Sequence, residues 1–316
     1  MRILKKMKSK IVSAYRAYRS FDMPLIFHMV INRVKYRHHS DFLRADWPHK
    51  VHFLRKHYGY LLEQCRKKPV SSAPNDGPVW VFWWQGNAQM PALVRFCFEN
   101  LKKQIPANRR LILLHKDNYR EFTDIPEYII RKLEMGIMNL THFSDIVRMS
   151  LLAKHGGLWI DSTVFVSSSI PDFIFEQPYF SGKEPWRPYG MEPMDFTLYL
   201  IGSSAGAPWV VFARDMLYEY WRKSWKLLDY LLISHILTIA LDSVPELKKQ
   251  VLECIFDMPE ANTLQNRRNM ACSSAQYEEL MSKGQFFKLS YKLDFKEYDE
   301  NGNLTYYGMM RKSVSI

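Results

Sequence analysis

The sequence predicts an α/β protein with a mostly parallel sheet flanked by helices, preceded by a basic helical extension. Two strand-then-helix units and a high apolar content lead to this prediction. The chain has 316 residues, 47% of them hydrophobic, which is enough to bury a large core. Alternating strands and helices are typical of a doubly wound parallel sheet. Such sheets bind ligands beyond the carboxyl ends of their strands.

The first strand-then-helix unit begins at residue 79. The run VWVFWWQG at 79–86 is rich in β-branched and aromatic residues and ends in glycine, as expected of a buried strand. A helical pattern follows from Pro91 to Leu101. The second unit repeats this order, with the strand-like RRLILLHKDN at 109–118 and the helical IPEYIIRKLEMG after it.

The basic residues are concentrated at the N-terminus. Residues 1–70 hold 17 of the 44 Lys and Arg but only 4 of the 32 Asp and Glu, so the rest of the chain is near neutral. Apolar residues recur among them at helical spacing. The stretch PVSSAPNDGP at 69–78 interrupts this pattern. We therefore predict a basic helical extension over 1–70, a main domain over 78–295 and a C-terminal tail over 296–316.

Two interpretations of this extension remain open. Its helices can lie in an anionic lipid headgroup layer, or they can pack their apolar stripe on the main domain. The chain opens without a secretory signal, no apolar run is long enough to span a bilayer, and its four cysteines show no CxxC spacing. We expect a cytoplasmic protein whose contact with any membrane is peripheral.

The segment HFSDIVRMSLLAKHGGLWIDSTVFV at 142–166 is the most informative. We expect Ser144 to cap a helix that ends at two glycines, followed by a short buried strand that presents Asp161 at its carboxyl end. Asp145 and Arg148 are three residues apart, so they are neighbours on one helix face. Taken singly, this pair fits a simple intrahelical ion pair, and Asp161 fits a turn-capping aspartate. Together they can converge on one ligand.

The string SDIVRMSLLAKHGGLWIDST closely resembles the signature of sugar transferases with a DXD motif, specifically the capsular polysaccharide synthesis branch. VFWWQG at 81–86 is similar to the opening strand of that branch, and KLSYK at 288–292 resembles its terminal Lys-Leu-x-x-Lys. The resemblance runs from about residue 79 to 292. It implies the Rossmann-like GT-A fold and a retaining transfer from a nucleotide-sugar donor to a capsule- or O-antigen-type polysaccharide or a lipid-linked glycan.

The resemblance also implies roles for particular residues. Asp145, Arg148 and Asp161 would be catalytic, and Asp161 with Thr163 would bind Mn²⁺ or Mg²⁺, which neutralises the leaving diphosphate. The donor would be bound by Trp84, which stacks on the base, together with Gln85, Asp145, Arg148, Gly157, Lys288 and Lys292. The sequence departs from the strict motif at Thr163, where a second aspartate would be the stronger metal ligand.

Two further features have competing interpretations. Trp186 and Tyr189, in the loop KEPWRPYGMEP at 183–193, can stack on the sugar rings of an acceptor or belong to an ordinary ordered loop. Asp229 and His235 are six residues apart, which is not a same-face helical spacing, so we predict no catalytic pair there. We predict that the aromatic and aliphatic residues around them, from 209 to 241, pack in the core.

Functions of other classes are also compatible with a basic chain. One is a non-enzymatic nucleic-acid-binding protein that uses the basic arm, and another is a catalytically silent scaffold at a membrane. The near-neutral main domain and the lack of any nucleic-acid fold signature argue against nucleic acid as a partner. We expect a nucleotide-sugar transferase that works at the inner face of a bacterial membrane, which it meets through the N-terminal helices.

Overall fold

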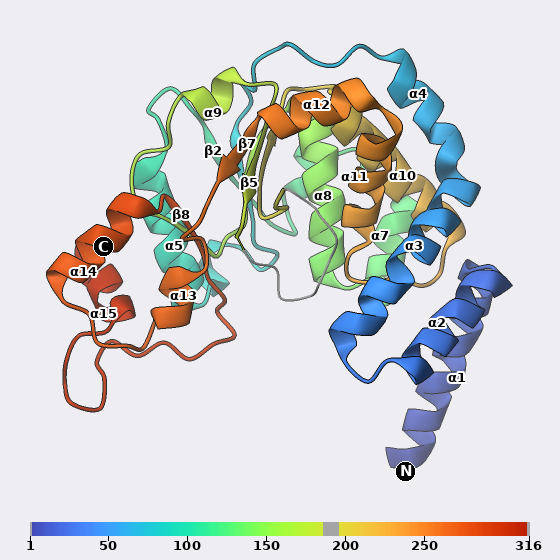
Figure 1. Ribbon diagram of the computed structural model, residues 1–316, viewed down its shortest axis with the longest axis horizontal. Helices are drawn as coiled ribbons and strands as arrows, with labels where there is room; N and C mark the ends of the chain where they lie inside the picture. The colour runs from blue at the N-terminus through green and yellow to red at the C-terminus, as the bar shows by residue number, and fades with distance from the viewer. Residues whose placement is uncertain (1, 186–195, 315–316) are drawn as a thin grey trace.

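The computed structural model describes residues 2–185 and 196–314, and Figure 1 shows how its elements are arranged. The strands are β1 (Val79–Phe82), β2 (Leu111–Leu114), β3 (Gly157–Ile160), β4 (Val164–Val166), β5 (Tyr179–Lys183), β6 (Leu200–Ser203), β7 (Ile255–Asp257) and β8 (Phe286–Lys288).

Helices make up most of the remaining described chain. They are α1 (Arg2–Ser20), α2 (Met23–Lys35), α3 (His39–Tyr58), η1 (Gly59–Leu61), α4 (Leu62–Lys67), η2 (Asn87–Gln89), α5 (Ala92–Gln104), α6 (Tyr119–Phe122), α7 (Glu127–Glu134), α8 (Leu140–His155), α9 (Phe173–Glu176), α10 (Pro208–Lys223), α11 (Leu232–Ser243), α12 (Pro245–Glu253), α13 (Thr263–Arg267), α14 (Ser274–Lys283) and α15 (Tyr306–Ser313).

Six strands form one sheet in the order β2-β1-β3-β6-β5-β7. β1 runs parallel to both β2 and β3, and β5 runs parallel to β7, while β6 is antiparallel to both of its neighbours. The predicted mostly parallel sheet is therefore confirmed. β4 and β8 pair separately as a small antiparallel sheet, so the VFV segment leaves the main sheet directly after Asp161.

Both faces of the sheet are covered, which explains why the strand at 79–82 is apolar throughout. Trp80 and Phe82 pack into the core that contains α8, α10 and α11, whereas Val79 and Val81 pack with α5 and α9 on the other face. Figure 1 shows these two helical layers on either side of the strands. Alternate residues of each strand thus point to different layers.

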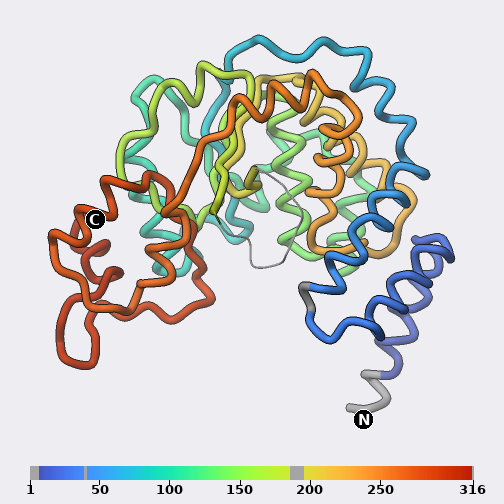
Figure 2. The backbone as a smooth tube through the Cα atoms, in the orientation of Figure 1, coloured from blue at the N-terminus to red at the C-terminus, as the bar shows by residue number. Residues whose placement is uncertain are grey.

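The N-terminal segment forms helices, and α3 and α4 pack on the main domain, with Cys65 of α4 buried against the start of α10. Phe53 and Leu54 of α3 are buried in the same core as α10 and α11, and Tyr58 lies 5.9 Å from Tyr220 between ring centroids. α1 and α2 extend away from this layer (Figure 2). No helix in residues 2–185 or 196–314 combines the length and apolar character needed to cross a bilayer.

The C-terminal segment lies on the opposite side of the sheet from α1 and α2 (Figures 1 and 2). Helix α15 falls within the predicted tail, and its Met310 is fully buried in a core shared with Phe96 of α5. The limits of the extension and of the tail stay predictions. The structure adds that both segments pack against the residues between them.

The helix that carries Asp145 begins earlier than predicted. Asn139 is its N-cap, and the Asn139 side chain accepts a hydrogen bond from the backbone N–H of His142 at 2.8 Å. Ser144 lies within the first turns and donates to the carbonyl of Thr141 at 2.7 Å. The predicted Ser144 cap is therefore wrong, because asparagine caps a helix as well as serine does and occurs five residues earlier.

Candidate functional site

The carboxyl ends of β1, β2 and β3 lie side by side because these three neighbouring strands are parallel. The residues that follow them are Trp83 and Trp84 after β1, His115 after β2 and Asp161 after β3. The backbone N–H of Lys116 donates to the carbonyl of Trp84 at 3.1 Å, which joins the first two loops. This edge is where a ligand is expected in an open α/β sheet.

Asp161 accepts hydrogen bonds from three side chains. Its Oδ1 accepts from Arg148 at 3.1 Å and from the indole N–H of Trp159 at 2.8 Å. Its Oδ2 accepts from the ammonium group of Lys288 at 2.7 Å. Asp161 therefore links α8 and the end of β3, which precede it directly, to the end of β8, which lies 127 residues further along the chain.

Two positive charges keep Asp161 ionised. Burial would raise the pKa of its carboxyl group, but Lys288 and Arg148 outweigh this effect and lower the pKa from 3.8 to about 2. The side chain is still 27% exposed, so a ligand can reach it. At neutral pH Asp161 is a charged positioning group and not a proton donor.

Asp145 and Arg148 form the predicted ion pair, with Arg148 donating to Asp145 at 3.0 Å. The pair is not an isolated surface contact, because Arg148 also reaches Asp161 and lies over the ring of Trp159 at 4.8 Å. Asp145 in turn lies 3.6 Å from Nδ1 of His142. We call Asp145, Arg148, Asp161 and Lys288 the strand-end cluster.

The predicted donor residues of the first loop lie beside this cluster. Trp84 is partly buried, and its ring packs near Tyr119 and Phe143 at 5.8 and 5.7 Å. The Phe82 ring lies between Trp84 and Trp159, at 6.2 and 6.4 Å from them. These rings form a continuous aromatic cluster in the core on the α8 side of the strand ends, and Trp84 is its partly exposed member.

Other predicted donor residues lie on the surface of the strand-end loops. Gln85 is exposed, and so is Lys292, on the loop after β8. Tyr291 of the same loop lies 5.4 Å from Trp83, so this loop crosses the end of β1. The structure thus brings the segments of Trp84, Gln85, Lys288 and Lys292 to one edge.

Gly157 is not brought to this edge. It begins β3, whereas Asp161 follows the end of that strand. Its φ of +100° and the 2.1 Å approach that a Cβ would make to the Pro78 carbonyl explain why only glycine fits there. The predicted acceptor residues Trp186 and Tyr189 lie outside the described residues.

Three contributors were missed by sequence reasoning. Trp159 is two residues before Asp161, so a period-2 strand pattern could have placed both side chains on one side. Tyr199 lies under the Lys288 ammonium group at 4.9 Å, and its hydroxyl donates to Glu184. His142 accepts from the indole N–H of Trp221 at 2.8 Å and lies 3.6 Å from Asp145 on its other side.

The predicted metal ligands already share a cation. The ammonium group of Lys288 donates to Asp161 at 2.7 Å and to Oγ1 of Thr163 at 3.0 Å. Among the described residues, no group of three or more His, Cys, Asp or Glu is arranged to hold a metal ion. One carboxylate that already accepts three N–H groups, with one hydroxyl, does not fit the oxygen-rich ligand set that Mg²⁺ or Mn²⁺ requires.

The fold and the site define an α/β protein with a cluster of charged side chains at the carboxyl ends of a mostly parallel sheet. Residues 31–310 match the family described as "Capsular polysaccharide synthesis protein". Since the match covers most of the chain, the chain belongs to this family.

Two further proteins are similar to parts of the chain. The O-glycosyltransferase braB of Annulohypoxylon truncatum is 27% identical over 133 residues, which are 40% of this chain and 30% of that protein. The match thus spans less than a third of this relative's length. A solved structure, the PaToxG Glycosyltransferase, aligns with 66% of this chain and 82% of its own length, with 13% identity and a TM-score of 0.39. A likeness as distant as the latter supports no inference about the site.

Proposed function

We propose that the protein is a glycosyltransferase of the GT-A type that transfers a sugar from a nucleotide-sugar donor to a surface-polysaccharide or lipid-linked glycan acceptor. The observation that carries the proposal is the strand-end cluster, which combines two carboxylates and two cations at the strand ends where the partly exposed Trp84 also lies. Carboxylates suit sugar hydroxyls, cations suit phosphates and aromatic rings suit a nucleobase. Family membership and the partial likeness to an O-glycosyltransferase support the same chemistry.

In the proposed reaction, an acceptor hydroxyl oxygen forms a bond to the anomeric carbon of the donor sugar. The bond from that carbon to the phosphate oxygen breaks, its electron pair stays on the leaving nucleoside diphosphate, and the hydroxyl proton is released. Trp84 and Gln85 would bind the base, and Asp145 with Arg148 would orient the sugar. Lys288 and Lys292 would meet the phosphates. We keep retention at the anomeric carbon and an acceptor contact by Trp186 and Tyr189 as parts of the proposal.

The proposal is tested by incubating the purified full-length chain with UDP-, GDP- and CMP-sugars and measuring the release of nucleotide. We expect one class of donor to be turned over. Asp161→Asn should lower its rate about 1000-fold, because the loss of a preorganised charge at the reacting groups costs this much. Asp124→Asn is the matched control, since Asp124 is 77% exposed and pairs with Lys154 at the surface.

Two results would contradict the proposed function. One is that no donor is bound or turned over, which would favour a catalytically silent scaffold. The other is an Asp161→Asn variant as active as the control, which would place the reaction elsewhere.

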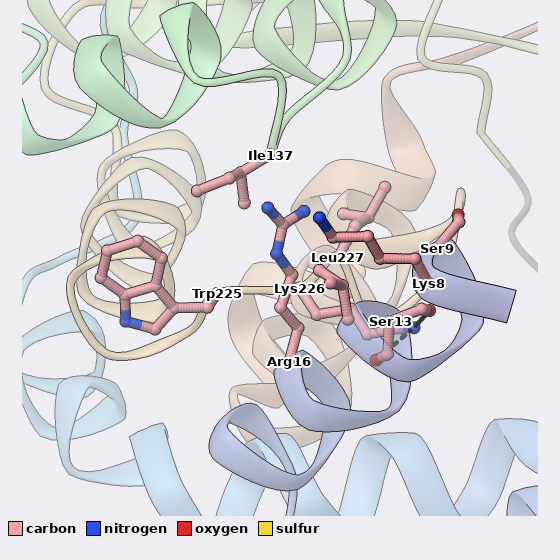
Figure 3. A pocket seen from close by; sticks show the side chains of 9 residues that line it. Lys8, Ser9, Ser13, Arg16, Ile137, Trp225, Lys226 and Leu227 are labelled. Carbon is pink, nitrogen blue, oxygen red and sulfur yellow. Dashed lines mark hydrogen bonds between the residues drawn. The ribbon is translucent and has the colours of Figure 1, made fainter. Parts of the chain in front are cut away.

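We also propose that α1 and α2 bind the anionic inner surface of a bacterial membrane. Their apolar side chains are exposed at Met7, Ile11, Val12, Tyr15, Tyr18, Met23, Phe27, Val30, Ile31 and Val34. A cavity of about 550 Å³ between α1 and the loop after α10 is lined by three basic side chains, Lys8, Arg16 and Lys226 (Figure 3). Burial and the nearby Arg16 and Arg33 lower the pKa of Lys226, because both effects disfavour its charged form. A lipid phosphate would relieve this repulsion.

Sedimentation with vesicles of phosphatidylglycerol and phosphatidylcholine tests this second proposal. We expect binding to anionic vesicles that weakens with salt, and a loss of about 30-fold on Lys8→Glu with Arg16→Glu, since each cation near the surface contributes about 1 kcal/mol. Lys248→Glu with Lys249→Glu on α12 is the control. Equal binding to pure phosphatidylcholine, or no binding at all, would contradict the proposal.

A further inference from the structure

Lys288 lies where the resemblance to metal-dependent sugar transferases implies a divalent cation. Its ammonium group joins Oδ2 of Asp161 and Oγ1 of Thr163, the two atoms predicted to ligate the metal. An ammonium group has three N–H donors. Two are used in these contacts, and the third remains for the Tyr199 ring or for a phosphate oxygen.

The residue types at this point favour the lysine over a metal. A threonine hydroxyl can accept a hydrogen bond from an ammonium group, but it is a weaker ligand than a carboxylate for a hard dication. The remaining carboxylate, Asp161, also accepts from Arg148 and Trp159. A dication between Asp161 and Thr163 would have to displace Lys288 and would then be repelled by Arg148.

The charges of the strand-end cluster balance without a metal. Asp145 and Asp161 supply two negative charges, and Arg148 and Lys288 supply two positive charges. An arriving diphosphate would find Lys288 at the end of β8, whose side chain is 25% exposed, and Lys292 on the loop that follows. This segment is held in place by the pairing of β8 with β4, which directly follows Asp161 and Thr163.

We propose that Lys288 takes the place of the divalent cation, so that this protein turns over its donor without a metal ion. The inference rests on the proposed transferase function. As the bond from the anomeric carbon to the phosphate oxygen breaks, the electron pair stays on the nucleoside diphosphate. Lys288 stabilises the charge that develops there, with Arg148 beside it. The acceptor oxygen forms the new bond and its proton is released to solvent, so no further reactant is needed.

The first test compares EDTA with added Mn²⁺ in two measurements on the full-length chain. Calorimetry follows the binding of UDP and of GDP, and nucleotide release follows the turnover of UDP- and GDP-sugars. We expect one nucleoside diphosphate to bind with the same affinity in EDTA and in Mn²⁺, and its sugar to be turned over at the same rate.

The outcomes separate this inference from the proposed function. Turnover and tight nucleotide binding that need Mn²⁺ would overturn the role of Lys288 and leave the transferase function standing. Absence of binding and turnover under both conditions would overturn both.

Variants at two positions sharpen the test. Lys288→Ala should lower turnover about 100-fold in EDTA, because it removes a preorganised cation from the leaving group. Lys283→Ala on α14 is the matched control, since Lys283 is exposed and pairs with Glu279. Lys288→Ala combined with Thr163→Asp should recover activity only when Mn²⁺ is added. A Lys288→Ala variant as active as the control, or a double variant indifferent to Mn²⁺, would overturn the inference.

Discussion

Two clusters of charged side chains join distant parts of this chain, and they differ in exposure and in surroundings. The strand-end cluster ties α8 to the ends of β3 and β8, and its Asp161 and Lys288 side chains are 27% and 25% exposed. The second cluster, which we call the buried cluster, consists of Asp46, Lys50, Asp229 and His235. Its Lys50 side chain is 2% exposed and lies 2.7 Å from Asp229, 179 residues away.

The two clusters have similar electrostatics and different consequences. Burial would raise the pKa of Asp229, but His235 and Lys50 outweigh this and hold the pKa well below its usual range. The same balance operates at Asp161. The buried cluster, however, fixes α3 against α11, and its Asp46, Lys50 and Asp229 line a cavity of about 700 Å³ beside α2. The strand-end cluster instead lies at the carboxyl ends of the parallel strands, where a ligand can reach it. Location, and not the presence of a perturbed carboxylate, separates a structural ion cluster from a candidate site.

The largest effect that can break this comparison is expected at Lys50. Lys50→Met should lower the free energy of unfolding by about 3–5 kcal/mol, because it leaves two buried carboxylates without their cation. Donor turnover per folded molecule should not change. Urea unfolding and nucleotide release measured on the same samples check both. The matched Lys288→Met variant should lose donor turnover and keep its free energy of unfolding. A Lys50→Met variant that loses turnover while keeping its stability would contradict the distinction between a structural cluster and a candidate site.

The geometry of Arg148 offers a second, smaller effect. Arg148→Lys keeps the charge but loses the planar guanidinium that reaches Asp145 and Asp161 together. We expect kcat for the donor to fall about 100-fold through misplacement of Asp161, with little change in unfolding. Steady-state kinetics with the identified donor check this, and an unchanged kcat would show that Arg148 serves only the packing of α8.

Trp159→Phe should have a still smaller effect. The substitution removes the indole N–H that donates to Asp161 and keeps a ring beneath Arg148. We expect turnover to fall about 10-fold and the free energy of unfolding to fall by about 1 kcal/mol, the usual contribution of one hydrogen bond. Trp225→Phe, at a residue that is 38% exposed, is the control. Equal turnover in both variants would remove Trp159 from the site.

Acid titration gives the smallest effect. The folded pKa of Asp161, about 2, lies below its ordinary value of 3.8. The stability this group contributes is therefore present above pH 3.8 and is lost as the pH falls toward 2. Chemical unfolding between about pH 4 and pH 2 should show a steeper loss of stability in the wild type than in Asp161→Asn. Identical slopes would mean that Lys288 and Arg148 do not stabilise the ionised carboxyl.

The sequence predicts the local parts of the site better than its long-range contacts. Periodicity predicts the strand at 79–82, and helix-ending glycines predict where α8 stops and where Asp161 follows the next strand. The structure confirms these elements. The family resemblance implies that Gly157 contacts the donor, but Gly157 begins β3 and Asp161 follows the end of that strand. The length of β3 separates Gly157 from Asp161, so the two residues lie at opposite ends of this strand.

The buried cluster shows what a spacing argument cannot predict. Asp229 and His235 were set aside because six residues do not share a helix face. Asp229 instead precedes α11, which begins at Leu232, and its carboxylate lies 3.0 Å from Nε2 of His235. Its contact with Lys50 depends on how α3 docks, which local patterns do not encode. The contact between Lys288 and Asp161 spans 127 residues and could be anticipated only through the family resemblance.

The central claim, that the strand-end cluster binds the nucleotide of the donor, is tested most directly by hydrogen exchange of the full-length chain with and without UDP or GDP. We predict that the bound nucleotide slows exchange at residues 83–86, 159–163 and 288–292, and leaves residues 46–50 and 229–235 unchanged. Slower exchange around the buried cluster, with none at 159–163, would contradict this account and move the ligand site to the N-terminal helices.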